Sequence, residues 1–80
     1  MPNKSMLRVN VACYSGFKGE ETPLSFIREE KRFQVVEVLE RKLEEDFHSK
    51  ERRRIFRVKT DNGRRYTLLY REKEEEWYLN

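Results

Sequence analysis

Apolar and polar residues alternate along much of this chain with a period of two, which is typical of half-buried strands. In MLRVNVAC, residues 6–13, the apolar side chains Leu7, Val9, Val11 and Cys13 share one parity. The following YSGFKGEETP, residues 14–23, contains two glycines and a proline and predicts a loop. A short strand is expected over LSFIRE, residues 24–29, and a turn follows it.

The run FQVVEVLERKLEEDF, residues 33–47, fits two periods. Helical spacing connects Val36, Leu39, Leu43 and Phe47. In contrast, FQVVEVL is rich in β-branched residues, which favour strands. We expect a long strand over residues 33–44, and the alternative is a helix over residues 35–47.

The segment RRRIFRVKTDNGRRYTLLYRE, residues 52–72, predicts a hairpin because Asn62-Gly63 stands between two alternating runs. A three-residue loop, residues 61–63, pairs Thr60 with Arg64. This register places the apolar side chains on one face, and a slip by one residue would move them to the other. That core face contains Phe56, Val58, Tyr66, Leu68 and Tyr70.

These elements, with a last strand through Trp77 and Leu79, predict one small β domain over residues 1–80. We expect an antiparallel meander of five or six strands, closed into a barrel or strongly curved. The alternative class is α+β with the helix at residues 35–47. A chain of this length buries only about 60% of its unfolded surface, which leaves little room for an enclosed catalytic cleft.

Charged residues make up 41% of the chain, and their distribution is uneven. Residues 48–71 hold nine Lys or Arg and two acidic residues, for a charge of +7, whereas the rest of the chain carries −4. In the predicted register Lys59 lies across from Arg65, and Arg53 across from Arg71, on the face opposite the core. Like charges directly opposite each other destabilise a sheet, so a bound anion would relieve them.

This basic face predicts a binding module without enzymatic activity that contacts the nucleic-acid backbone with weak sequence preference. The expected phosphate contacts are Arg53, Arg54, Arg57, Lys59, Arg64, Arg65 and Arg71. Acidic residues on a neighbouring strand could instead neutralise the face internally, with Glu40, Glu44 and Glu76 as candidates. The alternative function is a protein-interaction adaptor that uses the patch around Ile55 and Leu69 or an open sheet edge. The expected state is a monomer or an edge-paired dimer.

Catalysis and metal binding are not expected. The cysteine Cys13 has only His48 as a histidine partner, far along the chain, and one Cys with one His is too few for a zinc site. We expect Cys13 to be a small apolar residue at a strand end. No cofactor is predicted. No apolar run approaches the ~20 residues of a membrane span, and Arg8 and Asn10 interrupt the only candidate leader segment. A cytoplasmic location is expected.

The motifs CYSGFKGEETPLSF, FQVVEVLERK, FRVKTDNGRRYTLLY and a final WYL cover about residues 9–79. Together they resemble a family of short bacterial proteins of uncharacterised function. The family pattern combines Cys-Tyr-Ser-Gly-aromatic, a Val-Glu-Val-Leu strand and a hairpin ending in a Trp strand. The resemblance implies a strand over residues 33–44. It also implies that Cys13-Tyr14-Ser15-Gly16 has a role beyond ending a strand, and it implies no functional residues.

Overall fold

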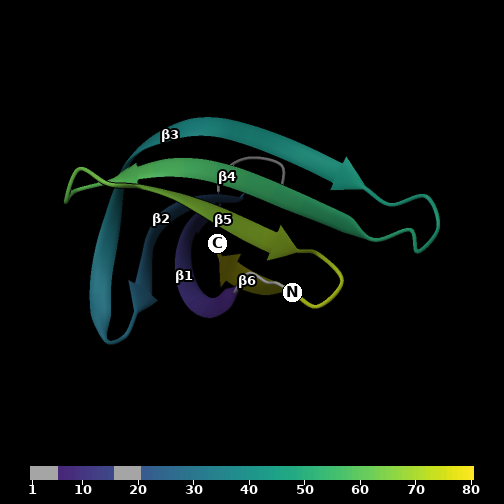
Figure 1. The fold of residues 1–80 in the computed structure, drawn as a ribbon, viewed down its shortest axis with the longest axis horizontal. Helices are drawn as coiled ribbons and strands as arrows, with labels where there is room; N and C mark the ends of the chain where they lie inside the picture. The colour runs from purple at the N-terminus through teal and green to yellow at the C-terminus, as the bar shows by residue number, and fades with distance from the viewer. Residues whose placement is uncertain (1–5, 16–20) are drawn as a thin grey trace.

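The structure is a computed structural model that describes residues 6–15 and 21–80. Six antiparallel strands follow one another around a closed barrel, each paired with its neighbours in the sequence, and the first strand pairs with the last (Figure 1). The strands are β1 (Leu7–Ser15), β2 (Glu21–Arg28), β3 (Lys31–Glu45), β4 (Arg52–Thr60), β5 (Arg65–Arg71) and β6 (Glu76–Leu79). The predicted small antiparallel barrel is confirmed. The helical alternative for residues 35–47 is wrong.

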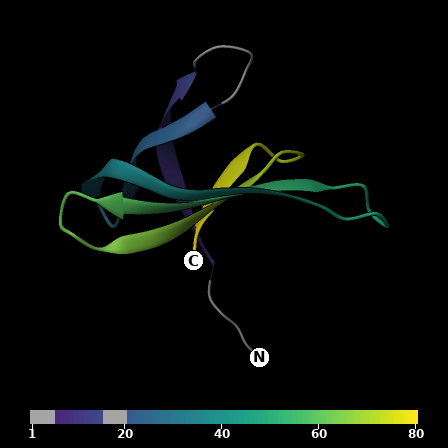
Figure 2. The same cartoon turned by 90° about the horizontal axis from the view of Figure 1, so that it is seen from above.

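The hairpin of β3 and β4 is longer than the barrel and projects from it. We call its far end the arm: residues 40–45 of β3, residues 52–57 of β4 and the turn between them. Figures 1 and 2 show the arm extending to one side, while the β1–β2 hairpin leaves the barrel in another direction. Most charged residues of β3 and β4 therefore lie on the arm, where much of the surface is in contact with solvent.

Apolar side chains of one parity fill the barrel, as alternation requires. Phe26 and Leu68 are fully buried, and the ring of Phe26 stacks on Phe33 with centroids 5.3 Å apart. Further along the barrel, the indole of Trp77 packs against the ring of Phe56 at 5.6 Å. Phe26, Phe56 and Trp77 thus belong to one buried core cluster inside the barrel.

The β4–β5 hairpin has the predicted register. The amide of Thr60 donates to the carbonyl of Arg64 at 2.9 Å, and Val58 lies opposite Tyr66. Gly63 has a φ of 82°, the left-handed conformation that the three-residue loop requires. Phe56, Val58 and Leu68 of the predicted core face are buried, whereas the two tyrosines, Tyr66 and Tyr70, are half-buried.

The loop predicted over residues 14–23 is too long at both ends. β1 continues to Ser15 and β2 already begins at Glu21, whereas residues 16–20 lie outside the described residues. Pro23 is buried within β2, opposite Cys13, where the pairing of β1 and β2 shifts by one residue. Proline is tolerated here because, among the described residues, this part of β2 has a partner strand only on the β1 side, so a missing N–H disrupts little.

β3 runs from Lys31 to Glu45, slightly longer than the predicted 33–44. Its pairing with β4 shifts twice, between Val35 and Glu37 and between Val38 and Glu40, so Val36 and Leu39 are the extra residues of two bulges. Both side chains are exposed. These two residues, with the exposed Leu43 and Phe47, are the ones whose spacing imitated a helical stripe.

Candidate nucleic-acid interface

The outward face of β4 and β5 carries the two like-charge pairs that the register predicts. Arg53 lies opposite Arg71 near the arm, and Lys59 lies opposite Arg65 near the β4–β5 turn. The two pairs are therefore equivalent positions on one hairpin, six residues apart on each strand, and their surroundings can be compared directly.

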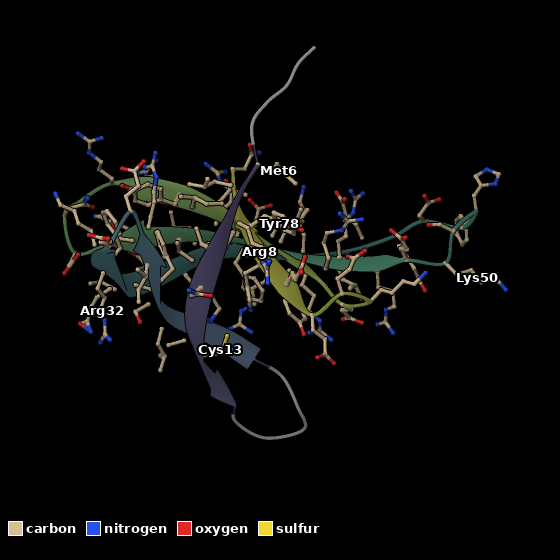
Figure 3. The ribbon with its side chains drawn as sticks, turned by 90° about the horizontal axis from the view of Figure 1, so that it is seen from below. Met6, Arg8, Cys13, Arg32, Lys50 and Tyr78 are labelled. Atoms are coloured by element: carbon tan, nitrogen blue, oxygen red, sulfur yellow. The ribbon has the colours of Figure 1, made fainter. Side chains whose placement is uncertain are left out.

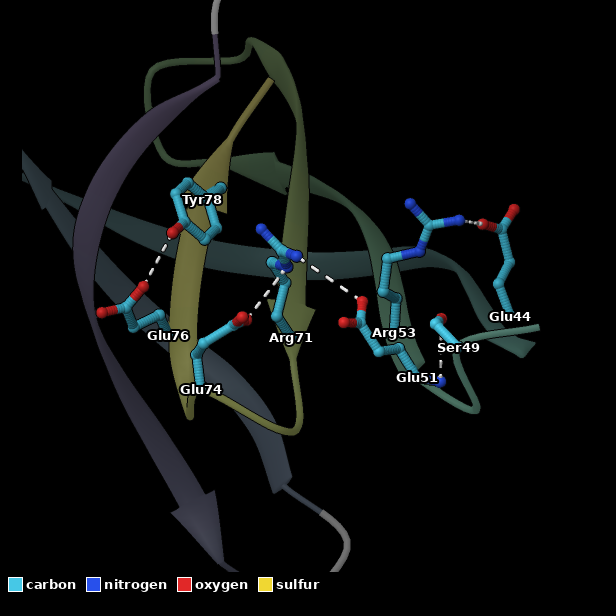
Figure 4. Close-up of polar contacts among 8 residues, drawn as sticks. All are labelled: Glu44, Ser49, Glu51, Arg53, Arg71, Glu74, Glu76 and Tyr78. Atoms are coloured by element: carbon cyan, nitrogen blue, oxygen red, sulfur yellow. Dashed lines mark hydrogen bonds and ion pairs between the residues drawn. The ribbon is translucent and has the colours of Figure 1, made fainter. Parts of the chain in front are cut away.

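The Arg53–Arg71 pair is surrounded by carboxylates. Glu44 on β3 accepts a hydrogen bond from Arg53 at 3.0 Å, and Arg71 lies 3.6 Å from Glu51 and 3.1 Å from Glu74 (Figure 4). These acids come from three different segments, so the fold itself brings them together. The repulsion between the two guanidinium groups is thereby neutralised within the protein.

Two more of the predicted site residues also have carboxylate partners. Arg57 lies 3.5 Å from Glu40, its neighbour across the sheet, and Arg54 donates to Glu72 at 2.6 Å. Such partly exposed pairs contribute about 0–1 kcal/mol each, so their importance for binding is charge compensation rather than stability. The alternative of internal neutralisation, which the sequence left open, is therefore realised for Arg53, Arg54, Arg57 and Arg71.

The Lys59–Arg65 pair has a different environment. Neither side chain, nor that of Arg64 in the turn, has a carboxylate within 4.0 Å among the residues that the structure describes. Glu37 lies opposite Lys59 across the sheet but forms no such ion pair there. The fold thus compensates one like-charge pair and leaves the equivalent one uncompensated.

One further cation belongs to this end of the barrel. β3 runs past the β4–β5 turn, because the amide of Asp61 donates to the carbonyl of Gln34 at 2.9 Å. Arg32 lies two residues before Gln34 on β3, about 7 Å away, and is exposed. We call Arg32, Lys59, Arg64 and Arg65 the turn end. Figure 3 shows Arg32 at the opposite extremity of the molecule from Lys50, in the arm. Arg32 was not predicted as a site residue from the sequence, because Glu29 and Glu30 precede it in a turn and offset its charge.

Glu76, the third acid proposed to neutralise the face, has another role. Its carboxylate lies 3.4 Å from Arg8 on β1 and accepts a hydrogen bond from the Tyr78 hydroxyl at 2.7 Å. This hydrogen bond, with a smaller contribution from burial, raises the pKa of Tyr78 above its ordinary value. Glu76 therefore stabilises the junction where β6 meets β1 and closes the barrel.

The patch around Ile55 and Leu69 is less accessible than predicted. Leu69 is buried and Ile55 is half-buried, although both have outward parity. In register, Lys42 lies beside Ile55 and Tyr78 lies beside Leu69, one on either side of the same row. The large apolar side chains that are exposed lie instead at the start of β1, on β2, on β3 and in the turn of the arm.

Cys13 lies within β1 rather than at its end, and its half-buried side chain packs against the core as a small apolar residue would. His48 lies in the turn of the arm, two residues before Lys50, and Figure 3 shows Lys50 at an extremity of the molecule away from Cys13. Cys13 also lines an open groove of about 440 Å³ between β1 and β6, together with Tyr70 and Trp77. In the described part of the chain, no three His, Cys, Asp or Glu residues come together as a metal site would require.

No family model, curated protein or solved structure matches this chain, so the resemblance to the family of short bacterial proteins stays a prediction. Among the described residues there is no helix long and apolar enough to cross a membrane.

Proposed function

We propose that this protein is a non-enzymatic binding module that contacts the nucleic-acid backbone through the turn end: Arg32, Lys59, Arg64 and Arg65. The observation that supports this is the contrast between the two like-charge pairs of one hairpin. Arg53 and Arg71 have carboxylate partners at 3.0–3.6 Å, whereas Lys59 and Arg65 have none among the described residues. An uncompensated pair gains most from an external anion.

Phosphate groups are the anions that the arrangement fits best. Exposed Lys and Arg side chains neutralise successive phosphates and release counterions, which gives affinity without reading base identity. The paired arginines are poorer candidates, since each would have to exchange a carboxylate for a phosphate. The proposal therefore narrows the contacts predicted from the sequence, which covered the whole basic face, to Lys59, Arg64 and Arg65 at one end of it, and adds Arg32.

The test is binding of the purified protein to a fluorescent single strand and to a duplex over a range of salt concentrations. The Lys59→Glu/Arg65→Glu variant is compared with Lys50→Glu/Lys73→Glu, which makes the same change in net charge at exposed positions beside the arm turn. We expect the first variant to lose binding and the second to retain most of it.

Binding by the wild-type protein should also fall steeply with salt, because each phosphate contact contributes about −0.7 to −0.9 to the slope of log K against log salt. Absence of wild-type binding at low salt would refute the proposal. Equal loss in both variants would show a diffuse charge effect and would refute the turn end as the site.

A second candidate, the protein-interaction adaptor, is favoured by the apolar side chains of the arm, where Leu43 is 52% and Phe47 88% exposed. An extended partner segment could add to the open edge of β3 beside them. A partner that is retained after nuclease treatment, and lost with Phe47→Ser, would support this function. Retention with Phe47→Ser would contradict it.

A further inference from the structure

The arm has an open edge along β3. β2 pairs with β3 only from Lys31 to Gln34, whereas β4 pairs with it from Val35 to Glu45. In Figure 1, β3 forms the outer border of the arm. The side of residues 40–45 that faces away from β4 therefore has no partner strand among the described residues. Unpaired edges of this kind are templates for pairing with another chain.

The backbone groups that this edge presents can be assigned. The carbonyl of Arg52 accepts a hydrogen bond from the amide of Glu72, on the β5 side of β4, so Arg52 and its β3 partner Glu45 direct their backbone N–H and C=O groups away from each other. Such pairs alternate along an antiparallel ladder. Arg41, Leu43 and Glu45 consequently direct their N–H and C=O groups away from β4, toward the open edge.

The sequence of the edge is self-complementary in charge. Residues 41–45 read Arg-Lys-Leu-Glu-Glu, two cations and two anions on either side of one leucine. If two copies pair antiparallel with Leu43 opposite Leu43, Arg41 faces Glu45 of the other copy and Lys42 faces Glu44. Every directly opposite charged pair within this stretch is then attractive, and the two exposed leucines cover each other.

The two-fold symmetry of such a dimer favours this register over registers that are shifted along the edge. In a closed two-fold antiparallel pair, the axis is perpendicular to the sheet and one residue on each strand faces itself. Leu43 is the only uncharged residue in Glu40–Glu45, so an axis at any other position there would oppose two like charges. The bulges at Val36 and Leu39 end the regular edge on one side. On the other side, Glu40 would face only Asp46, which lies beyond the end of β3.

We propose that two copies of this chain form a dimer by antiparallel pairing of their β3 edges, centred on Leu43. The pairing extends each β3–β4–β5 sheet into that of the partner. In this sheet Glu44 lies between Arg53 of its own chain and Lys42 of the other copy, so both sides of the carboxylate face a cation. The turn ends of the two copies lie away from the contact, so the dimer leaves the proposed nucleic-acid contacts accessible.

Sedimentation equilibrium under reducing conditions, which exclude a Cys13 disulfide, measures the dimer. Residues 42 and 44 are the positions to vary, because they face each other across the contact. Glu44→Lys also removes the ion pair with Arg53 within its own chain, so the mixture of the two variants is the decisive comparison. Lys42→Glu opposes two glutamates across the contact, and Glu44→Lys opposes two lysines. Each variant alone should therefore raise the dimer Kd about tenfold or more. Mixed in equal amounts, the two variants can pair with an attractive contact on each side of the axis. We expect the mixture to form a heterodimer more readily than either variant pairs with itself.

The matched controls are Lys73→Glu and Glu30→Lys, which make the same charge changes at exposed turn positions away from the edge, and both should leave the dimer unchanged. Circular dichroism checks that all four variants remain folded. A wild-type protein that is monomeric up to millimolar concentration overturns the proposal. So does a dimer that Lys42→Glu and Glu44→Lys leave intact, or a mixture that stays monomeric. Nucleic-acid binding by the monomeric variants would show that the two proposals are independent.

Discussion

Replacement of Phe26 by alanine should be among the most damaging substitutions in this domain. The side chain is fully buried, and its ring stacks on Phe33 at 5.3 Å and meets the edge of Tyr66 at 5.4 Å. Phe-to-Ala changes in cores cost about 3–5 kcal/mol, which includes the cavity that remains. Domains of this length have total stabilities of about 4–12 kcal/mol. Phe26→Ala should therefore remove a large fraction of the free energy of unfolding.

Trp77 provides the signal for the measurement, because the chain has one tryptophan and it is 8% exposed in the fold. Its ring partners are Phe56 and Tyr70 rather than Phe26, so its fluorescence reports global unfolding and not the substitution itself. Urea titrations followed at Trp77 should give a midpoint shift equivalent to about 3 kcal/mol or more. In thermal unfolding, this corresponds to a Tm lower by about 12 °C or more.

Ile27 is the matched control. It is the next residue along β2, but its side chain has the opposite parity and is 41% exposed. Ile27→Ala should cost less than about 1 kcal/mol, because little buried surface is lost. Equal destabilisation by the two substitutions would refute this barrel interior, since the Phe26 side chain would then not pack inside the barrel against Phe33 and Tyr66.

Three further predictions concern the hairpin turn and the barrel junction. Gly63→Ala should destabilise the domain by about 1 kcal/mol in urea titrations, because φ is 82° and a Cβ would meet no atom within 4 Å, which leaves conformational strain as the cost. Thr60→Val, which removes the hydroxyl that donates to Asn62, should cost about 1 kcal/mol in the same assay, and no change would contradict the hydrogen bond. The raised pKa of Tyr78 means that the folded state favours the protonated phenol. Its contribution to stability is therefore complete below about pH 10 and is lost as the pH rises through the higher folded value. Urea titrations at increasing alkaline pH should show this loss in the wild type and not in Tyr78→Phe.

The β4–β5 hairpin could be predicted to the residue because several local signals agree. Asn62-Gly63 supplies the turn, and alternation on both sides leaves one register that buries Phe56 and Leu68 together. The information is local in sequence, and the two strands are joined by a short turn. Both like-charge pairs followed from this register alone and are present in the structure.

β3 was harder to predict because its bulges disturb the period. Each bulge adds one exposed residue to the strand. The two added residues, Val36 and Leu39, together with Leu43 have the spacing of residues on one face of a helix. No glycine or proline marks either bulge in the sequence. The start of β2 was missed for a related reason: Pro23 predicts a loop, and only the position of β1 on one side makes a strand proline acceptable.

The same bulges explain why the carboxylate partners of Arg53 and Arg57 could not be predicted from the sequence. Val35 lies opposite Thr60, so uninterrupted pairing would continue to place Lys42 opposite Arg53 and Glu44 opposite Glu51, two repulsive contacts. Two shifts of one residue instead bring Glu44 to Arg53 and Glu40 to Arg57. The two bulges, which the composition does not reveal, thus create the ion pairs that neutralise the arginines of the arm. The first shift also brings Glu37 opposite Lys59, but the two side chains form no ion pair among the described residues, so the uncompensated charge is concentrated at the turn end.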